Sequence, residues 1–193
     1  MIKVGIVGSG AMGSGIAQIA ATAGHEVLIY DNNPDALSRS EAKLEKIMAR
    51  LVEKGRLSEA DAAGIQSRIT YIDSIYNFRG VGLVVEAIVE RLDVKKAVFE
   101  QLEDVLGDDA ILATNTSSLP VAAIAAACQH PERVLGLHFF NPAPLMALVE
   151  VIPAVQTDTA IVDRCFSLMK DWQKVPVIAK DTPGFIVNRV ARP

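Results

Sequence analysis

The protein has 193 residues, of which 50% are hydrophobic and 22% are charged, proportions typical of an α/β domain that buries its own core. Its formal net charge of −4 disfavours a general nucleic-acid-binding role, which needs a basic surface. No apolar run is long and uninterrupted enough to span a membrane, and the first residues resemble a strand rather than a signal peptide. We therefore expect a cytoplasmic protein with no nucleic-acid or membrane partner.

Short apolar runs rich in β-branched residues alternate with stretches of helical spacing through the first half of the chain. Strands are expected at residues 2–7, 26–30, 69–72 and 81–86. Helices are expected at residues 11–23, 33–54 and 91–106, with an interruption at Gly55 and a further helix from Ser58 or Glu59. This alternation predicts a parallel sheet built from βα units.

The second half of the chain alternates less regularly. Strands are expected at residues 111–114, 134–139, 148–152 and 175–178, and helices at 121–127, at 159–171 and from near Pro183. Asp181 and Thr182 are candidate caps for the last helix. Because full helices do not separate all of these strands, we expect a Rossmann-like, doubly wound, mostly parallel sheet with antiparallel pairing at this edge.

The two cysteines, Cys128 and Cys165, lie in apolar stretches of helical character, and no CxxC pair occurs. Such positions predict buried, reduced thiols. We expect no disulfide and no metal site.

A glycine-rich turn joins the first expected strand to the first expected helix. It consists of Gly8, Ser9, Gly10, Ala11, Met12 and Gly13. The first glycine permits a tight turn, the second lets the backbone approach a pyrophosphate, and the third lets the helix pack closely on the strand. The helix N-terminus offers free N–H groups and a positive dipole end to the phosphates. A glycine turn that merely starts a helix is the plainer alternative.

Asp31 ends the second expected strand, about 20 residues after the turn, and completes the dinucleotide-binding pattern. Its carboxylate can accept hydrogen bonds from the adenosine ribose and would repel the additional phosphate of NADP. No arginine lies beside it, since the next residues are Asn32 and Asn33. NAD is therefore the expected cofactor, and FAD stays open on the motif alone.

Among the three histidines, His138 is the candidate for chemistry because it lies at the end of an expected strand, where open α/β sheets bind ligands. Glu150 lies in the next expected strand, in an apolar run where a carboxylate needs a partner. If these strands pair, the carboxylate would orient the imidazole and stabilise its protonated form. The pair is either a proton-transfer dyad or a buried ion pair that braces a hairpin. His25 and His130 lie in turns, and we expect both to be solvated.

Polar residues near two other strand ends allow a structural or a ligand-binding role. Ser118 is expected to cap the helix that begins near residue 121, whereas the role of Ser117 is open. Glu90 is expected at a solvated helix start, and Lys95, one turn further, on the surface.

The long helix at residues 33–54 carries a basic series. It consists of Lys43, Lys46, Arg50 and Lys54. This series suits a solvated helix face, and it would also attract a polyanion such as coenzyme A. Trp172 lies near a helix end and is expected to pack rather than to bind a ligand.

Five segments together resemble the L-3-hydroxyacyl-CoA dehydrogenase family. They are residues 8–13, Val-Glu-Ala-Ile-Val-Glu at 85–90, Thr-Asn-Thr-Ser-Ser at 114–118, His-Phe-Phe-Asn-Pro at 138–142 and Asp-Thr-Pro-Gly-Phe-Ile-Val-Asn-Arg at 181–189. Within the family the chain is similar to bacterial 3-hydroxybutyryl-CoA and 3-hydroxyadipyl-CoA dehydrogenases, including those of phenylacetate breakdown. This finer similarity rests partly on residues 188–193.

The resemblance implies roles for individual residues. His138 matches the catalytic base and Glu150 its partner carboxylate. Ser117 and Asn188 match the polar residues that hold the reacting oxygen of the substrate. Asp31 matches the ligand of the adenosine ribose.

Residues that line the NAD site of the family match Glu90, Lys95, Ser117 and Asn141. Lys54 matches a lysine that contacts coenzyme A. A serine that contacts coenzyme A in some relatives falls on Ile47.

Family members continue into an all-helical C-terminal domain, which closes the substrate cleft, supplies most of the dimer contact and is absent from this chain. The resemblance thus divides the chain into an NAD-binding Rossmann domain at residues 1–182 and the start of a truncated helical domain at 183–193. It implies a homodimer for the full-length parent and weak or absent turnover for the 193-residue chain itself.

The reaction implied by the resemblance is the reversible, NAD-dependent oxidation of a 3-hydroxyacyl-CoA to a 3-ketoacyl-CoA, in fatty acid or phenylacetate-type catabolism. Two alternatives stay open: another hydroxyacid dehydrogenase on this scaffold, and a non-catalytic NAD-binding protein similar to the crystallins that resemble the family. The sequences around His138 and Asn188 count against the first, and the intact pair of His138 and Glu150 counts against the second.

Overall fold

The computed structural model describes residues 1–191, and within them eight strands form a sheet in the order β3-β2-β1-β4-β5-β6-β7-β8. The strands are β1 (Val4–Val7), β2 (Val27–Tyr30), β3 (Ile69–Ile72), β4 (Leu83–Glu86), β5 (Ile111–Thr114), β6 (Val134–Phe139), β7 (Leu148–Pro153) and β8 (Val175–Ile178). β1 pairs in parallel with both β2 and β4, so the strand order reverses there. This topological switch point, where such sheets bind ligands, confirms the doubly wound Rossmann-like fold.

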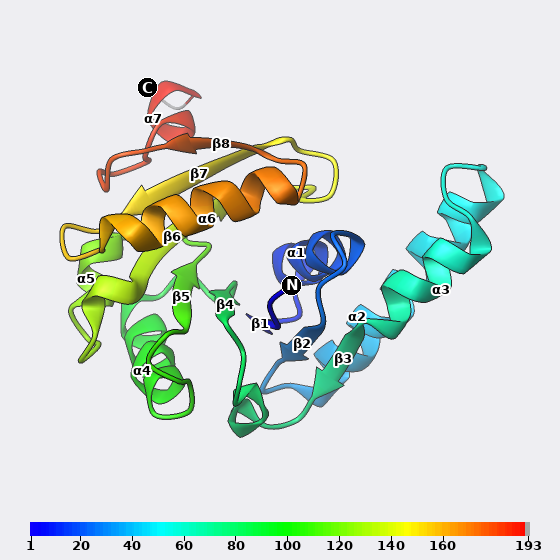
Figure 1. Ribbon diagram of the computed structural model, residues 1–193, viewed down its shortest axis with the longest axis horizontal. Helices are drawn as coiled ribbons and strands as arrows, with labels where there is room; N and C mark the ends of the chain where they lie inside the picture. The colour runs from blue at the N-terminus through cyan, green and yellow to red at the C-terminus, as the bar shows by residue number, and fades with distance from the viewer. Residues whose placement is uncertain (192–193) are drawn as a thin grey trace.

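Helices cover both faces of the sheet (Figure 1). They are α1 (Ala11–Thr22), α2 (Pro34–Glu53), α3 (Glu59–Ser67), α4 (Leu92–Glu103), α5 (Val121–Ala125), α6 (Thr159–Asp171) and α7 (Val187–Ala191), with 3-10 turns η1 (Ile75–Phe78) and η2 (Pro131–Arg133). α1 and α6 share one apolar cluster with Ile6, whereas α4 and α5 share a second cluster with Val7. Neighbouring strand residues enter opposite clusters because side chains alternate across a strand. The central strands are therefore mostly apolar.

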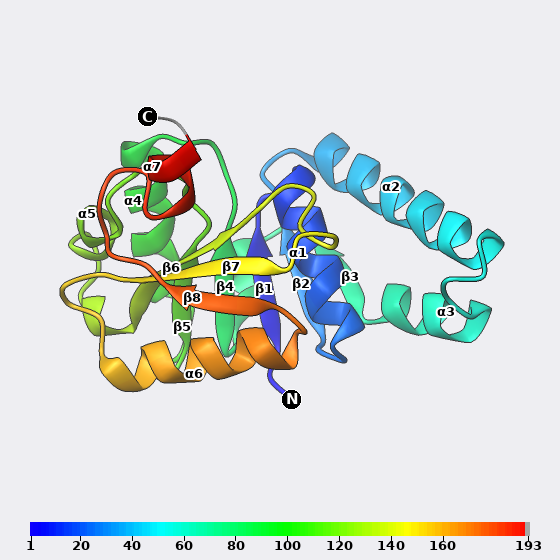
Figure 2. The ribbon, with the colours of Figure 1, turned by 90° about the horizontal axis from the view of Figure 1, so that it is seen from above.

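The antiparallel pairing expected at the C-terminal edge is confirmed for β6 and β7. β7 and β8 are parallel because α6 carries the chain back to the starting end of the sheet. Figure 2 shows α6 lying along this edge.

α2 and α3 extend together beyond the β3 edge of the sheet (Figures 1 and 2). Asn33 caps α2 by accepting a hydrogen bond from Asp35 N at 3.0 Å, and Pro34 occupies the first turn. Gly55 separates the two helices with a φ of +64°, as expected from the sequence. No helix within residues 1–191 is both long enough and apolar enough to cross a membrane.

The last helix begins later than expected. α7 starts at Val187 rather than near Pro183, because Gly184 (φ +77°) and Phe185 (φ +48°) adopt left-handed conformations that precede it. Part of the segment expected to begin a helical domain, residues 192–193, lies outside the described residues.

Asp181 caps a different helix from the expected one. Its carboxylate oxygens accept hydrogen bonds from Val121 N at 2.9 Å and Ala122 N at 2.7 Å, so it caps α5. Ser118, expected to cap this helix, instead has its hydroxyl 3.2 Å from Glu90. The carboxylate of Asp181 therefore joins the segment after β8 to the start of α5.

Candidate active site

The glycine turn lies at the switch point, between β1 and α1. Gly8 has a φ of +100°, and a Cβ there would lie 2.6 Å from the carbonyl oxygen of Ala87. A Cβ on Gly13 would collide with the carbonyl oxygen of Gly8, so the close packing of α1 on β1 requires this glycine. Gly10 faces open space, with no heavy atom within 4 Å of a Cβ placed there. This geometry leaves room for a phosphate at the N-terminus of α1.

Asp31 is held by the same turn. Its Oδ2 accepts hydrogen bonds from the backbone N–H and the hydroxyl of Ser9, each at 2.8 Å, and its Oδ1 accepts one from Asn33 N at 3.0 Å. A cavity of about 420 Å³ opens beside Asp31 and Gly10, with walls that include Ile88 and Val98. An aspartate fixed beside such a cavity can bind the ribose of an adenosine whose base enters it.

His138 and Glu150 face one another across the antiparallel pair β6 and β7. The distance from His138 Nδ1 to Glu150 Oε2 is 2.6 Å, and both side chains are buried. The rings of Phe140 and Phe185 lie 4.5 and 5.7 Å from the imidazole. A carboxylate at Nδ1 favours a proton on that nitrogen and leaves Nε2 as the acceptor. This pair can therefore accept and return a proton.

The other oxygen of Glu150 anchors the chain that leads into α7. Glu150 Oε1 accepts hydrogen bonds from Ile186 N and Val187 N, both at 2.9 Å. The next residue, Asn188, donates from Nδ2 to the carbonyl oxygen of Ser117 at 3.1 Å. The structure thus brings Ser117 and Asn188 together, and it anchors the segment before Asn188 to the same glutamate that contacts His138.

Glu90 organises the turn after β5. Its Oε1 accepts hydrogen bonds from Thr116 Oγ1 at 2.6 Å, Ser117 N at 2.9 Å and Ser118 N at 3.2 Å. Burial alone would raise the pKa of Glu90, but these hydrogen bonds and the charge of Lys95 lower it below its ordinary value. Glu90 was expected to be a solvated residue at a helix start. It is instead the acceptor of the hydrogen bonds that organise this turn.

Lys95 is buried, which corrects its expected surface position. Its Nζ lies 2.6 Å from Glu86 Oε1 and 3.4 Å from Glu90 Oε2. Glu86 also accepts a hydrogen bond from Thr114 Oγ1 at 2.8 Å. Glu86 was not among the predicted site residues, although a glutamate at the end of an apolar strand is a signal for a buried partner.

A second cavity, of about 410 Å³, lies between α1, α2 and the loop after β6. Its lining includes Asn141 and Ile47 together with four cationic residues. These are Lys43, Arg50, Lys54 and Arg56. Three of the four basic residues singled out on the long helix therefore face a cavity, whereas Lys46 does not line it. Cations around an apolar cavity suit a ligand that is part phosphate and part apolar chain.

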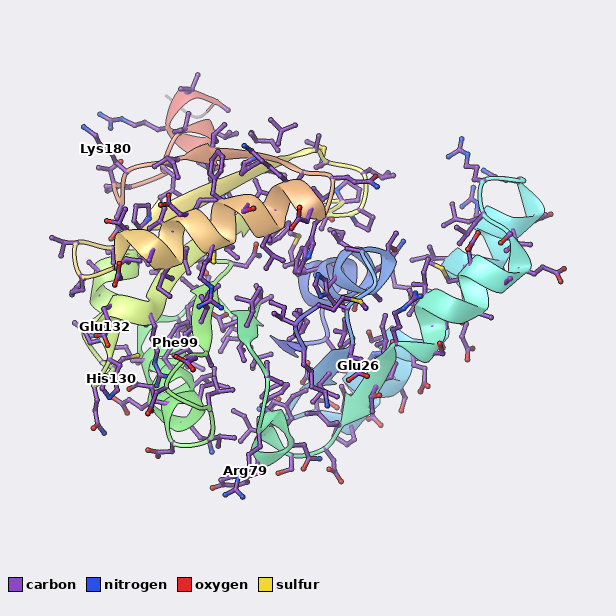
Figure 3. The ribbon with its side chains drawn as sticks, in the orientation of Figure 1. Glu26, Arg79, Phe99, His130, Glu132 and Lys180 are labelled. Carbon is purple, nitrogen blue, oxygen red and sulfur yellow. The ribbon has the colours of Figure 1, made fainter. Side chains whose placement is uncertain are left out.

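The remaining histidines lie away from both cavities. His130 is exposed, with its Nδ1 3.1 Å from Glu132 Oε1, and the two side chains lie at the periphery of the molecule (Figure 3). His25, expected to be solvated, is buried: its Nδ1 lies 3.0 Å from the carbonyl oxygen of Ile2, and its ring lies against Trp172. Trp172 is buried in the core, as expected.

Both cysteines are buried free thiols, as expected. Burial raises the pKa of Cys128 and of Cys165 to about 12, which leaves both thiols protonated and unreactive at neutral pH.

Comparisons with known proteins agree with this arrangement. The family described as "3-hydroxyacyl-CoA dehydrogenase, NAD binding domain" matches residues 3–182. "3-Hydroxyadipyl-CoA dehydrogenase" of Escherichia coli (strain K12) is 47% identical over 98% of this chain and 40% of its own length. "3-Hydroxybutyryl-CoA dehydrogenase" of Clostridioides difficile is 41% identical over 100% of this chain and 68% of its own length.

A crystal structure of 3-hydroxybutyryl-CoA dehydrogenase from Escherichia coli K12 superimposes with a TM-score of 0.98 at 45% identity, over 100% of this chain and 41% of that one. The chain thus spans less than half of the Escherichia coli relative and about two thirds of the clostridial one. By sequence and by fold, the chain belongs to the family of NAD-binding domains of 3-hydroxyacyl-CoA dehydrogenases.

Proposed function

We propose that the protein takes part in the reversible, NAD-dependent oxidation of the 3-hydroxyl group of a 3-hydroxyacyl-CoA to a 3-keto group. The observation that carries this proposal is the contact of 2.6 Å between His138 Nδ1 and Glu150 Oε2. His138 lies near the carboxyl end of β6, on the same side of the sheet as the dinucleotide turn after β1. Relatives named 3-hydroxyadipyl-CoA and 3-hydroxybutyryl-CoA dehydrogenase support it. A role in fatty acid or phenylacetate-type catabolism would follow from this reaction.

In this proposal His138 is the catalytic base. Its Nε2 takes the proton of the 3-hydroxyl group, and the bonded carboxylate of Glu150 stabilises the imidazolium that forms. Ser117 and Asn188 hold the reacting oxygen, which is consistent with their contact at 3.1 Å. NAD, when bound, supplies the hydride acceptor. In the reverse direction His138 returns its proton to the substrate oxygen.

We assign the pyrophosphate of NAD to residues 8–13 and its adenosine ribose to Asp31, which the hydrogen bonds from Ser9 support. Glu90, Lys95, Ser117 and Asn141 would line the nicotinamide half. Lys54 would contact coenzyme A at the cavity of about 410 Å³, where Lys43, Arg50 and Arg56 add positive charge for its phosphates.

We also propose a domain division, an oligomeric state and a cellular location. In this proposal residues 1–182 are the NAD-binding domain, and residues 183–193 are the start of a helical one. We further propose that the full-length parent is a homodimer in the cytoplasm with no nucleic-acid or membrane partner. Size-exclusion chromatography with light scattering tests the dimer, and cell fractionation tests the location.

The reaction is tested by NADH consumption, measured on the complete polypeptide that carries these residues. Acetoacetyl-CoA and longer 3-ketoacyl-CoA substrates are compared with free 3-keto and 2-keto acids. We expect turnover only with the coenzyme A esters. Turnover of free acids alone would instead identify another hydroxyacid dehydrogenase, and NADH binding without turnover of any substrate would identify a non-catalytic NAD-binding protein.

A further inference from the structure

Glu86 is the last residue of β4 and pairs in register with Val7, the residue before the glycine turn. It therefore lies at the switch point of the sheet, next to the proposed phosphate site. Its side chain is 0% exposed. A carboxylate so completely buried persists only where hydrogen bonds and an opposite charge replace its lost water.

Three donors from three parts of the chain meet the carboxylate of Glu86. Lys95 Nζ lies 2.6 Å and Ile88 N 2.7 Å from Oε1, and Thr114 Oγ1 lies 2.8 Å from Oε2. These bonds connect the ends of β4 and β5 to the first turn of α4. The carboxylate thus fixes where Lys95 points.

Lys95 lies between two carboxylates but is unequally shared. Its Nζ is 2.6 Å from Glu86 and 3.4 Å from Glu90, so Glu86 takes the stronger bond. Two glutamates and one lysine carry a net charge of −1 when all three are ionised. The negative charge that Lys95 does not neutralise therefore falls mainly on Glu90, whose side chain is 37% exposed.

This charge lies on one side of the dinucleotide site. Asp31 at the end of β2 marks the adenosine side of the switch point, so a dinucleotide that crosses it places its other half over the ends of β4 and β5. Glu90 and its partner Ser117 lie there, 2.9 Å apart from carboxylate oxygen to backbone nitrogen. The nicotinamide ring is cationic when oxidised and neutral when reduced, so a fixed anion near it affects the two forms differently.

We propose that Glu86 is a positioning residue that draws Lys95 away from Glu90, and that the anion left at Glu90 favours NAD⁺ over NADH at this site. This inference rests on the proposed NAD-dependent function. Glu86 itself does not contact the cofactor in this scheme. It acts through Lys95 and sets the balance between the oxidised and reduced cofactor.

The test uses Glu86→Gln, which keeps the size of the side chain and removes its charge. Lys95 then has Glu90 as its remaining anionic partner, and the net charge of the cluster becomes zero. We expect the ratio of Kd for NAD⁺ to Kd for NADH to rise about fivefold at low salt. NADH is titrated by its fluorescence, and NAD⁺ by competition against NADH.

Glu103→Gln is the matched control. The side chain of Glu103 is 7% exposed, pairs with Arg133 at 3.3 Å and accepts bonds from Gln129 N and His130 N, but it lies at the opposite end of α4. We expect it to lower stability in urea and to leave the ratio unchanged. Glu86→Asp, which keeps the charge, is expected to restore the parent ratio even where stability is reduced.

Glu90→Gln removes the anion itself and tests the inference even where Glu86→Gln does not fold, because it is expected to raise the same ratio. If the parent binds both forms of the cofactor, and Glu86→Gln or Glu90→Gln has the same ratio of Kd for NAD⁺ to Kd for NADH as the parent, this inference is overturned. The proposed function then stays intact. A parent that binds neither form would overturn both.

Discussion

His138 is the residue on which the proposed chemistry depends most. Its Nδ1 is hydrogen-bonded to Glu150 at 2.6 Å, so Nε2 is the nitrogen that can take a proton. We expect His138→Gln to lower kcat by about 10²- to 10⁴-fold, because glutamine cannot accept the proton of the hydroxyl group. Steady-state kinetics on the complete polypeptide measure this loss, and NADH binding is expected to stay within about twofold because the base does not hold the cofactor.

His130→Gln is the control for this substitution, because His130 is exposed and bonded to Glu132 at the periphery. It is expected to leave kcat unchanged. A kcat of His138→Gln within a few-fold of the parent would show that His138 is not the base.

Ionisation of Glu90 makes the stability of the folded protein depend on pH. Its folded-state pKa lies below the ordinary value of 4.5, so its contribution to stability is fully present above that value and is lost as the pH falls through the folded-state pKa. We expect Glu90→Gln to lower the free energy of unfolding at pH 7 and to differ less from the parent as the pH falls below 4.5. Urea denaturation at pH 7, 4 and 3 measures this difference.

Glu26→Gln is the control, because its side chain is 75% exposed and its bond to Lys3 is long, at 3.7 Å. It should change the stability little at any of these values. A deficit of Glu90→Gln that stays constant with pH would contradict the assignment of an ionised Glu90.

At the scale of elements, α5 depends on a cap supplied from a distant part of the chain. Asp181 follows β8 and accepts hydrogen bonds from Val121 N and Ala122 N at 2.9 and 2.7 Å. We expect Asp181→Ala to lower the free energy of unfolding by about 1–2 kcal/mol, as for the loss of a charged N-cap. Urea denaturation measures it.

Asp108→Ala, at an exposed loop position, serves as the control for this cap and should have little effect. Equal stability of the Asp181→Ala protein and the parent would show that the two hydrogen bonds contribute nothing net to stability.

At the scale of the whole molecule, the proposed cofactor site lies at the switch point between β1 and β4, where the two halves of the sheet meet. A ligand that binds only the folded chain stabilises all of it. We expect NADH at a hundredfold its Kd to raise the free energy of unfolding by about 2.7 kcal/mol. The same concentration of NADPH is expected to have a much smaller effect, because Asp31 would face its additional phosphate. Equal stabilisation by both would contradict the assignment of Asp31.

Much of the fold was predictable because its signals are local. The spacing of Gly8, Gly10 and Gly13 and the acid at Asp31 predicted the first βα unit and its turn, and the structure has both. The contact of His138 with Glu150 was predicted on the condition that their strands pair, and β6 and β7 do pair. Local pattern was sufficient for the turn, whereas the contact also needed this pairing.

Other features depended on contacts between different elements of the fold. Lys95 is buried because Glu86, in another element, supplies a partner. His25 is buried because Trp172, near the C-terminal edge, covers it. Asp181 caps α5 across 60 residues of sequence. No local pattern carries such information, so the helix-start position of Lys95 and the turn position of His25 both predicted exposure.

Resemblance to a family supplied the roles expected of Ser117 and Asn188, whereas the sequence by itself determined the order of strands and helices along the chain and the dinucleotide turn. These follow from periodicity and from the backbone needs of glycine, which are properties of neighbouring residues. Only the tertiary structure decided which buried charges are paired, where the last helix begins and how Glu86, Lys95 and Glu90 share their charge. The physical reason is that the cost of burying a charge depends on the groups packed around it, and the fold brings those groups together from different elements.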